Sequence, residues 1–361
     1  MRTKLRPSLR TVFVLALAIP VLLAHGGRAQ SANDILTGAK PADIPPTWKP
    51  WIGEYGDPHP HSPSVTATVL AEKDGFIQIL ERTKRSDGVH YELGDRFPTH
   101  RFSPGDHGLY ANHSGKRLLV SGDVVYSKIS IDFDARAQVL ISPIRPVGEL
   151  RTEALAAVPP REDGPFRKPD LVELAPLDPS IHLDIRYATS NDFLGTPVYS
   201  EARAFLQRPG AEALLRVQQK LKLLSYGLLI HDAYRPWYVT KIFWDATPPE
   251  GKIFVADPAQ GSRHNRGCAV DLTLYDLATG KSIEMPGTYD EMSPRSFPDY
   301  PGGTSLQRWH RDLLRRAMES EGFTVYEAEW WHFDYKDWKE YPILNVPFEK
   351  LGLDAGAGAV H

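Results

Sequence analysis

The 361-residue sequence contains a single cysteine, Cys268. One thiol allows no intrachain disulfide, so the folded protein depends on core packing and on any metal that it binds. It also excludes a lipoprotein anchor, which needs a cysteine close to the N-terminus. We interpret Cys268 as a small packing residue, because no histidine and acid are otherwise arranged to activate it as a nucleophile.

The sequence also lacks a hydrophobic run long enough to cross a bilayer, which takes about 20 residues. Residues 12–24 are apolar, and they follow a basic stretch and precede small residues. This pattern is typical of a secretory signal peptide, which we place at residues 1–29. We therefore expect a periplasmic or secreted protein with no stable membrane span once the signal is cleaved.

An excess of basic charge is absent too. The formal net charge is −3, and residues 1–29 hold five of the basic residues and no acid, so the remaining chain is more acidic still. An acidic chain disfavours a nucleic-acid partner. With 42% hydrophobic and 24% charged residues the composition is that of a globular protein, and the length accommodates two domains.

Two regions differ in their hydrophobic pattern. Residues 45–150 show the alternation of apolar and polar residues that is typical of antiparallel strands, as in "VTATV" and "FIQIL" around an "EKDG" turn. The proline-rich and charged residues 151–169 break this pattern, and we interpret them as a linker. Residues 170–345 then form the second domain, and residues 346–361 a C-terminal tail.

The second domain mixes both periodicities. Apolar residues at helical spacing after Pro209 predict one helix, and a second helix is expected over residues 306–321 with Gly322 as its end. The stretch "YGLLIHDAYRP" predicts a strand that leaves into a loop at Pro236. Spacing alone therefore indicates only a mixed α and β domain.

Two short stretches carry residues suited to metal binding. "SRHNRGCAVDLTL" places His264 seven residues before Asp271, and "EAEWWHFDY" places Glu329 three residues before His332. Two imidazoles and one carboxylate make three ligands and leave a fourth tetrahedral position for water, as catalytic zinc requires. Glu329 then remains as a general base.

These stretches resemble the zinc D-alanyl-D-alanine dipeptidases, which are relatives of the D,D- and L,D-carboxypeptidases. The H-E-x-x-H motif of thermolysin-type peptidases is absent, whereas S-x-H-x-x-G-x-A-x-D and E-x-x-H are both present. "LDIRYATSNDFLGTPVY" and "DAYRPW" are similar to the dipeptidase branch in particular. The resemblance covers about residues 170–340 and implies a compact α+β domain with an antiparallel sheet, preceded by a small all-β domain.

The resemblance also implies a role for each site residue. His264, Asp271 and His332 would bind one Zn²⁺ per chain, and Glu329 would act as base and then as acid. Arg235 would stabilise the oxyanion, although a guanidinium before a proline can also serve a structural salt bridge.

Two further residues match substrate-binding positions of the family. Asp290 would hold the free ammonium group of the substrate, or else serve as a helix cap or a turn acid. Ser262 lies where the family has a substrate-binding hydroxyl. Tyr187, Asn191 and Phe193 are expected to wall the pocket or to serve the core.

The leading hypothesis is an exported zinc dipeptidase that hydrolyses D-alanyl-D-alanine or a similar D,D-dipeptide during cell-wall peptide turnover. One alternative is a D,D- or L,D-carboxypeptidase that trims peptidoglycan stem peptides. The other is a catalytically silent wall-binding module. The small dipeptide is the expected partner, and peptidoglycan is a further candidate partner for the β-rich domain.

Overall fold

The computed structural model describes residues 35, 38–56, 67–85, 88–98, 109–111, 117–121, 124–127, 141–291 and 293–352. The signal peptide expected at residues 1–29 lies outside the described residues. Within them, no helix is both long and apolar enough to cross a membrane.

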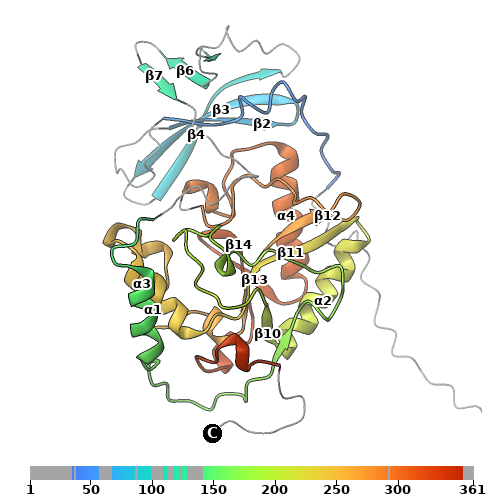
Figure 1. Cartoon of the computed structure of the whole chain (residues 1–361). Helices are drawn as coiled ribbons and strands as arrows, with labels where there is room; N and C mark the ends of the chain where they lie inside the picture. Colours follow the sequence, from blue (N-terminus) through green and yellow to red (C-terminus); the bar gives the residue numbers. More distant parts are fainter. Residues whose placement is uncertain are drawn as a thin grey trace, which may run out of the picture. The chain divides into compact units, whose positions relative to one another are not determined.

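Two antiparallel sheets form the N-terminal part of the chain (Figure 1). The first has the strand order β1-β2-β3-β4, in which the strands are β1 (Gly53–Tyr55), β2 (Ala67–Lys73), β3 (Phe76–Arg85) and β4 (Gly88–Pro98). The "EKDG" turn joins β2 to β3, with Asp74 and Gly75 at positive φ. The second sheet contains β5 (Leu109–Ala111), β6 (Arg117–Ser121) and β7 (Val124–Ser127).

A five-stranded sheet organises the rest of the chain. Its strand order is β13-β14-β12-β11-β9, in which the strands are β13 (Phe323–Tyr326), β14 (Glu329–Tyr335), β12 (Ala269–Asp276), β11 (Tyr226–Asp232) and β9 (His182–Leu183). Neighbouring strands are antiparallel except β9, which runs parallel to β11. Two short strands, β8 (Leu171–Glu173) and β10 (Phe205–Gln207), pair separately. The protein is thus α+β with antiparallel sheets.

Helices α2 (Arg208–Lys222) and α4 (Ser305–Glu319) pack against each other and against this sheet. Pro209 lies in the first turn of α2, where its missing N–H costs nothing. A capping box of Thr304 and Gln307 begins α4. Both helices were expected from their apolar spacing, and the expected strand at residues 226–232 is β11.

Helix α1 (Val147–Ala156) lies where the sequence suggested the end of the β-rich domain and the start of a linker. It packs against α3 (Trp237–Ala246), and its Leu150 and Ala154 are buried in the same apolar cluster as the central sheet. The expected boundary at residue 150 therefore falls inside a helix. Because the apolar periodicity of residues 147–156 is weak, no helix is predicted here from the sequence.

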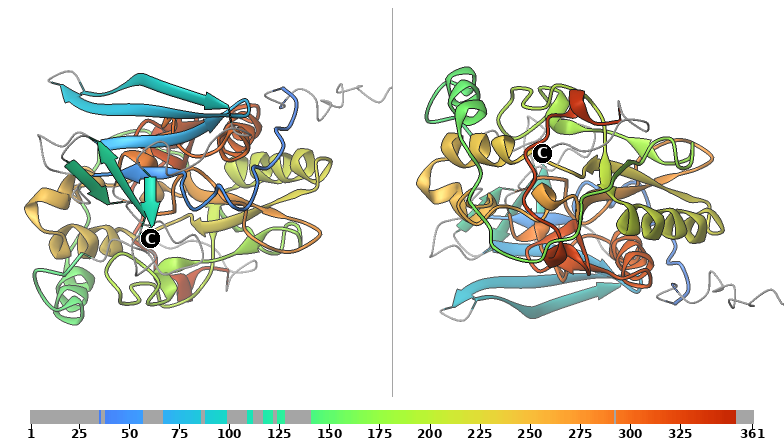
Figure 2. Two further views of the ribbon diagram at one scale, coloured as in Figure 1. Left: turned by 90° about the horizontal axis from the view of Figure 1, so that it is seen from above. Right: turned by 90° about the horizontal axis from the view of Figure 1, so that it is seen from below.

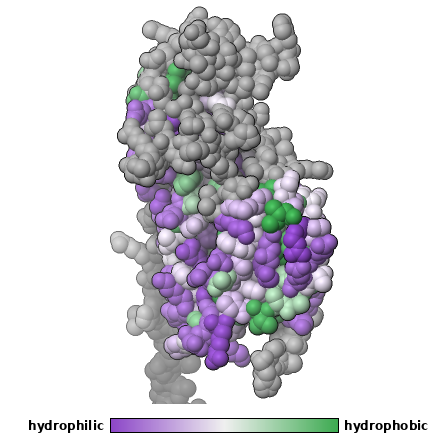
Figure 3. Space-filling view, turned by 90° about the vertical axis from the view of Figure 1, so that its left-hand side faces the viewer, coloured by the Kyte–Doolittle hydropathy of each residue, from purple (hydrophilic) through white to green (hydrophobic). Residues whose placement is uncertain are grey.

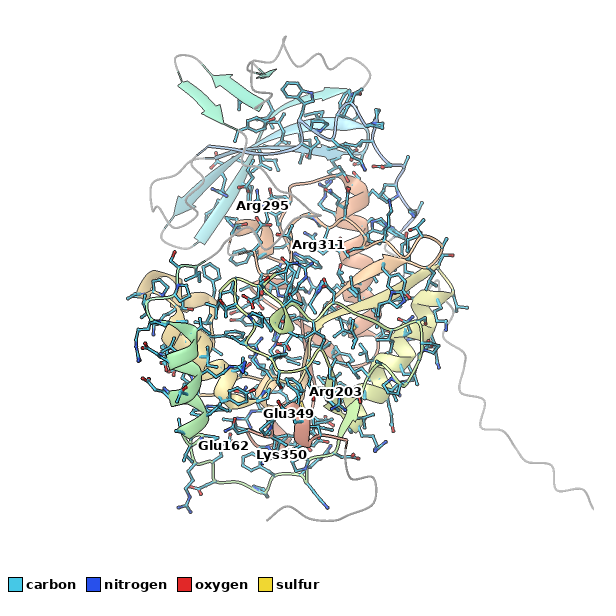
Figure 4. The ribbon with its side chains drawn as sticks, viewed as in Figure 1. Glu162, Arg203, Arg295, Arg311, Glu349 and Lys350 are labelled. Atoms are coloured by element: carbon cyan, nitrogen blue, oxygen red, sulfur yellow. The ribbon has the colours of Figure 1, made fainter. Side chains whose placement is uncertain are left out.

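The expected C-terminal tail also begins inside the folded domain. Phe348 is fully buried in the main cluster. Arg203, labelled in Figure 4 beside Glu349 and Lys350, donates to the carbonyl oxygens of Phe348 and Leu351 at 3.2 Å. On the face drawn in Figure 3, the coloured residues are mainly hydrophilic, with apolar ones scattered among them.

Strand β2 and the start of α4 lie side by side (Figure 2). The Glu72 carboxylate accepts a hydrogen bond from the Ser305 backbone N–H at 2.8 Å, and the Glu72 N–H donates to the Gly303 carbonyl at 3.0 Å. Tyr300 packs into a small apolar cluster with Val69 and other residues of β2 and β3. The first sheet therefore touches the segment that leads into α4.

Candidate metal centre and active site

Three segments meet where β12 and β14 pair. Asp271 of β12 lies directly opposite His332 of β14 in the register. His264 belongs to a short 3₁₀ turn, His264–Arg266, just before β12. Gly267 ends that turn at φ +68°, which strains a residue with a side chain, and a Cβ there would lie 2.4 Å from the Leu171 side chain, so glycine is favoured. This turn directs His264 back towards the paired strands.

The three side chains converge on one point. His264 Nε2 lies 3.1 Å from His332 Nδ1, and Asp271 Oδ1 lies 3.4 Å from the first and 3.0 Å from the second. All three residues are buried. Asp271 Oδ1 has no hydrogen-bond partner, whereas Oδ2 of the same carboxylate accepts from the Tyr289 hydroxyl at 3.1 Å. A buried carboxylate oxygen without a donor, beside two facing imidazole nitrogens, is the arrangement of a metal site.

The outer nitrogen of each histidine is held by an acceptor. His264 Nδ1 donates to the Ala233 carbonyl oxygen at 2.6 Å, and His332 Nε2 donates to Asp334 Oδ1 at 3.0 Å. Carbonyl and carboxylate oxygens only accept, so the hydrogen of each ring lies on the outer nitrogen. When the rings are neutral, the inner nitrogens, which face Asp271, therefore keep a lone pair for a cation.

The electrostatics of the cluster favour positive charge. Burial alone would raise the pKa of Asp271, but His264 and His332 outweigh it and hold this pKa well below its usual range. Burial lowers the pKa of His332, but Asp271 and Asp334 raise it to about 10. The cluster therefore attracts a cation, which is either a proton on the His332 ring or a metal ion that takes the place of that proton.

Glu329 lies beside this cluster. Its Oε2 is 3.7 Å from His332 Nδ1. Residues three apart on a regular strand point to opposite faces, but the pairing of β13 with β14 shifts between Val325 and Tyr326. This bulge lets Glu329 and His332 reach the same side. Burial raises the pKa of Glu329 to about 7, which suits a group that takes and returns a proton.

Arg235 follows β11 and is held by Asp232. Its Nε and Nη2 donate to Asp232 Oδ2 at 3.0 and 2.7 Å. Its guanidinium also lies over the rings of Tyr187 and Phe243, at 5.3 and 4.9 Å from their centroids. Arg235 therefore forms a structural salt bridge with Asp232 and also lines the cavity. Asp232 fixes one edge of a guanidinium that lines the site.

Asp290 adds a second buried carboxylate. It lies in a loop at φ +57°, and its Oδ2 accepts from the Tyr187 hydroxyl at 2.9 Å. Burial raises the pKa of Asp290 well above its usual range, and the charges of Asp271 and Glu329 add to this. A bound ammonium group would relieve this repulsion. Ser262 accepts from the His264 backbone N–H at 3.2 Å, which leaves its O–H free to donate.

These groups share one cavity of about 500 Å³. All seven site residues expected from the sequence line it: Arg235, Ser262, His264, Asp271, Asp290, Glu329 and His332. Of the three expected wall residues, Tyr187 and Phe193 line the cavity and Asn191 does not. The Asn191 backbone N–H instead donates to Thr189 within a turn.

Several neighbours could be seen only in the structure. Asp334 and Tyr289 hold His332 and Asp271 through contacts that sequence spacing does not reveal. Trp330 and Trp331 are buried in the core and do not line the cavity, while Trp338 does. Cys268 is buried, and burial raises the pKa of its thiol to about 12, which agrees with a packing role.

The comparisons with known proteins match this region. Residues 167–349 match the family described as D-ala-D-ala dipeptidase. The chain belongs to the D-ala-D-ala dipeptidase family. It is therefore a peptidase of the metal-dependent kind, and the matched residues include the central sheet, α2 to α4 and all seven site residues.

Individual relatives agree with this family. The D-alanyl-D-alanine dipeptidase of Escherichia coli (strain K12) is 34% identical over 179 residues, which are 50% of this chain and 91% of that protein. The Enterococcus faecalis (strain V583) protein of the same name is 35% identical over 193 residues, 48% of this chain and 95% of its own length. The D-alanyl-D-alanine dipeptidase of Streptomyces coelicolor is 34% identical over 175 residues, which are 44% of this chain and 87% of that protein. Each relative is thus matched over most of its length by about half of this chain.

Proposed function

We propose that the protein is a zinc-dependent dipeptidase that hydrolyses D-alanyl-D-alanine or a closely similar D,D-dipeptide. The observation that carries this proposal is the unpaired, buried Oδ1 of Asp271 facing His264 Nε2 and His332 Nδ1, with Glu329 and Arg235 in the same cavity. The names of the family and of its relatives supply the substrate class.

Zinc fits the donor set. Two neutral imidazoles and one carboxylate are a common ligand set for a catalytic zinc ion, and His264, His332 and Asp271 would hold one ion per chain. When bound, zinc supplies a Lewis acid that polarises a carbonyl group and makes water more acidic.

The surrounding residues then have distinct tasks. Glu329 takes a proton from the attacking water and returns it to the amine that leaves when the C–N bond breaks. Arg235, fixed by Asp232, stabilises negative charge that develops on the carbonyl oxygen. Asp290 binds the free ammonium group of the dipeptide, and the Ser262 hydroxyl donates a hydrogen bond to an acceptor oxygen of the dipeptide.

The setting of the enzyme is part of the proposal. The apolar stretch at residues 12–24 supports export by a cleavable signal peptide. An exported dipeptidase would act in cell-wall peptide turnover in the periplasm or outside the cell. The N-terminal strands would provide an all-β accessory domain, for which peptidoglycan is a candidate partner.

Amino-acid release tests this function. Zinc-loaded protein should cleave D-Ala-D-Ala but neither L-Ala-L-Ala nor a D-Ala-terminated pentapeptide. Glu329→Gln should lower kcat by about 10²- to 10⁴-fold, because it removes the proton acceptor but keeps the size of the side chain. Glu327→Gln is the matched control, since Glu327 is exposed two residues away and does not line the cavity.

Three results would change the assignment. Release of D-Ala from the pentapeptide would identify a carboxypeptidase instead. No release from any of the three substrates, with zinc bound, would favour a wall-binding protein. Equal loss of activity in the two glutamate variants would contradict the role of Glu329 as the base.

A further inference from the structure

Three arginines line the cavity, and two of them are already engaged. Arg235 donates to Asp232 with two of its nitrogens. Arg266 pairs with Glu162, labelled in Figure 4, and donates to the Tyr341 carbonyl oxygen. Of the three, Arg263 has the fewest polar contacts among the described residues, a single ion pair with Asp334.

The guanidinium of Arg263 is fixed without being saturated. It lies 5.4 Å from the ring centroid of Tyr326 and 5.0 Å from that of Trp338, so two aromatic faces hold its plane. Among the described residues its ion-pair partner is Asp334, at 3.1 Å from Nη1. A guanidinium has five N–H donors, and 35% of the Arg263 side chain is exposed. Arg263 therefore presents free donors to the cavity.

The positive charge of Arg263 is only partly neutralised. In the part of the chain that the structure describes, Asp334 is its single anionic partner, and the same carboxylate accepts from His332 Nε2 at 3.0 Å. One carboxylate is thus shared between a guanidinium and a histidine that faces the metal position. This leaves room for a second carboxylate at Arg263, one supplied by a ligand.

Arg263 and Asp290 line the same cavity and adjoin the metal ligands through different residues. Arg263 reaches the cluster through Asp334 and His332. Asp290 adjoins Tyr289, which donates to Asp271. A dipeptide whose ammonium group met Asp290 and whose carboxylate met Arg263 would hold its peptide bond inside the cavity that contains the cluster, where hydrolysis requires it.

We propose that Arg263 is a specificity-determining residue that binds the C-terminal carboxylate of the dipeptide. This inference rests on the proposed function, and it adds the residue that recognises the second charge of a zwitterionic substrate. A bidentate bond from a preorganised guanidinium suits a carboxylate far better than a neutral amide.

The alternative role of Arg263 is to position Asp334 and, through it, His332. The two roles predict different behaviour towards a ligand that lacks the negative charge. If Arg263 binds the carboxylate, replacing it weakens the binding of D-Ala-D-Ala and leaves the binding of D-alanyl-D-alaninamide unchanged. If Arg263 instead positions Asp334 and His332, replacing it weakens zinc binding and weakens the binding of both ligands equally.

The test measures binding by calorimetry to zinc-loaded Glu329→Gln protein, which should bind without cleaving. We expect this protein to bind D-Ala-D-Ala about 10- to 100-fold more tightly than D-alanyl-D-alaninamide, as loss of a charged hydrogen bond implies. Adding Arg263→Gln should remove most of that preference, and Arg263→Lys should restore part of it. Zinc affinity, measured by chelator competition, should change little in either variant.

An unchanged preference in the Arg263→Gln protein overturns the proposal. The proposal is also overturned if the variant binds both ligands equally less tightly and binds zinc more weakly. That result would show that Arg263 positions Asp334 and His332. Arg263→Lys keeps the charge and tests the proposal even if the glutamine variant folds poorly. Failure of the proposed function would show separately, as absence of D-Ala-D-Ala hydrolysis by protein with Glu329 intact.

Discussion

At the scale of single residues, the site depends on pairs in which one side chain orients another. His332 can offer Nδ1 to a cation only because Asp334 holds the hydrogen of Nε2, and Arg235 keeps its edge towards the cavity because Asp232 binds the opposite edge. The supporting carboxylates are buried beside the groups they serve. Their loss should therefore weaken metal and substrate binding, and it should also destabilise the fold by leaving a buried partner unpaired.

Asp334→Asn should lower zinc affinity by about 10- to 100-fold, because an amide holds the His332 ring less firmly and makes it a weaker ligand. Competition with a chromogenic chelator measures this. The control is Asp337→Asn, since Asp337 pairs with Arg167 at 3.1 Å and not with a histidine of the cluster. Unaltered zinc affinity in Asp334→Asn would contradict the account.

Sequence reasoning reached the residues whose spacing forms a motif, and it missed those that act across space. His264, Asp271, Glu329 and His332 were found because two short stretches contain them. Asp334 lies in one of those stretches, yet nothing in the sequence shows that its oxygen meets His332 Nε2. Contacts of this kind depend on strand register and bulges, which sequence spacing does not determine.

At the scale of elements, the bulge between β13 and β14 and the packing of α4 position the catalytic strand. His310 of α4 is buried, and its Nε2 lies 2.9 Å from the Tyr226 hydroxyl at the start of β11. The helices α2 and α4 could be predicted because their apolar residues recur at helical spacing. Helix α1 could not, because it lacks a continuous apolar stripe.

The contact between α4 and β11 predicts a pH dependence of stability. Burial lowers the pKa of His310 to about 4, whereas the same group titrates near 6.5 in an unfolded chain. The unfolded state thus takes up a proton first as the pH falls, and the folded state loses stability between pH 6.5 and 4. By pH 4.5 the loss from this group should be roughly 2–3 kcal/mol.

His310→Gln removes this titration and keeps a hydrogen-bonding partner for Tyr226. The free energy of unfolding should therefore decrease less between pH 7 and pH 4.5 in the variant than in the unaltered protein. Urea unfolding at the two pH values measures the difference. An equal decrease in both proteins would show that His310 is not held neutral by the fold.

At the scale of the whole molecule, the family-matched residues 167–349 follow two N-terminal sheets that lie outside the match. The first sheet is not independent of the matched part, because the buried Glu72 carboxylate caps the first turn of α4. A negative charge at a helix N-terminus is favourable, and it satisfies the Ser305 N–H. The sheet thereby supports the helix that leads to the β13–β14 pair.

Glu72→Ala should destabilise the protein by about 1–3 kcal/mol, since the Ser305 and Gly75 N–H groups both lose their acceptor. Hydrogen exchange at the Ser305 amide should also become faster. The neighbouring exposed Lys73→Ala is the control and should change neither value noticeably. Unchanged protection of Ser305 in Glu72→Ala would show that the sheet does not support α4.

The central proposal is that His264, His332 and Asp271 would hold one zinc ion beside Glu329, through His264 Nε2, His332 Nδ1 and Asp271 Oδ1. Anomalous scattering at the zinc absorption edge, from crystals of zinc-loaded protein, tests it most directly. The account predicts one strong peak coordinated by those three atoms, which disappears in crystals of Asp271→Ala. A peak at other residues, or no peak in this cavity under zinc saturation, would contradict the account.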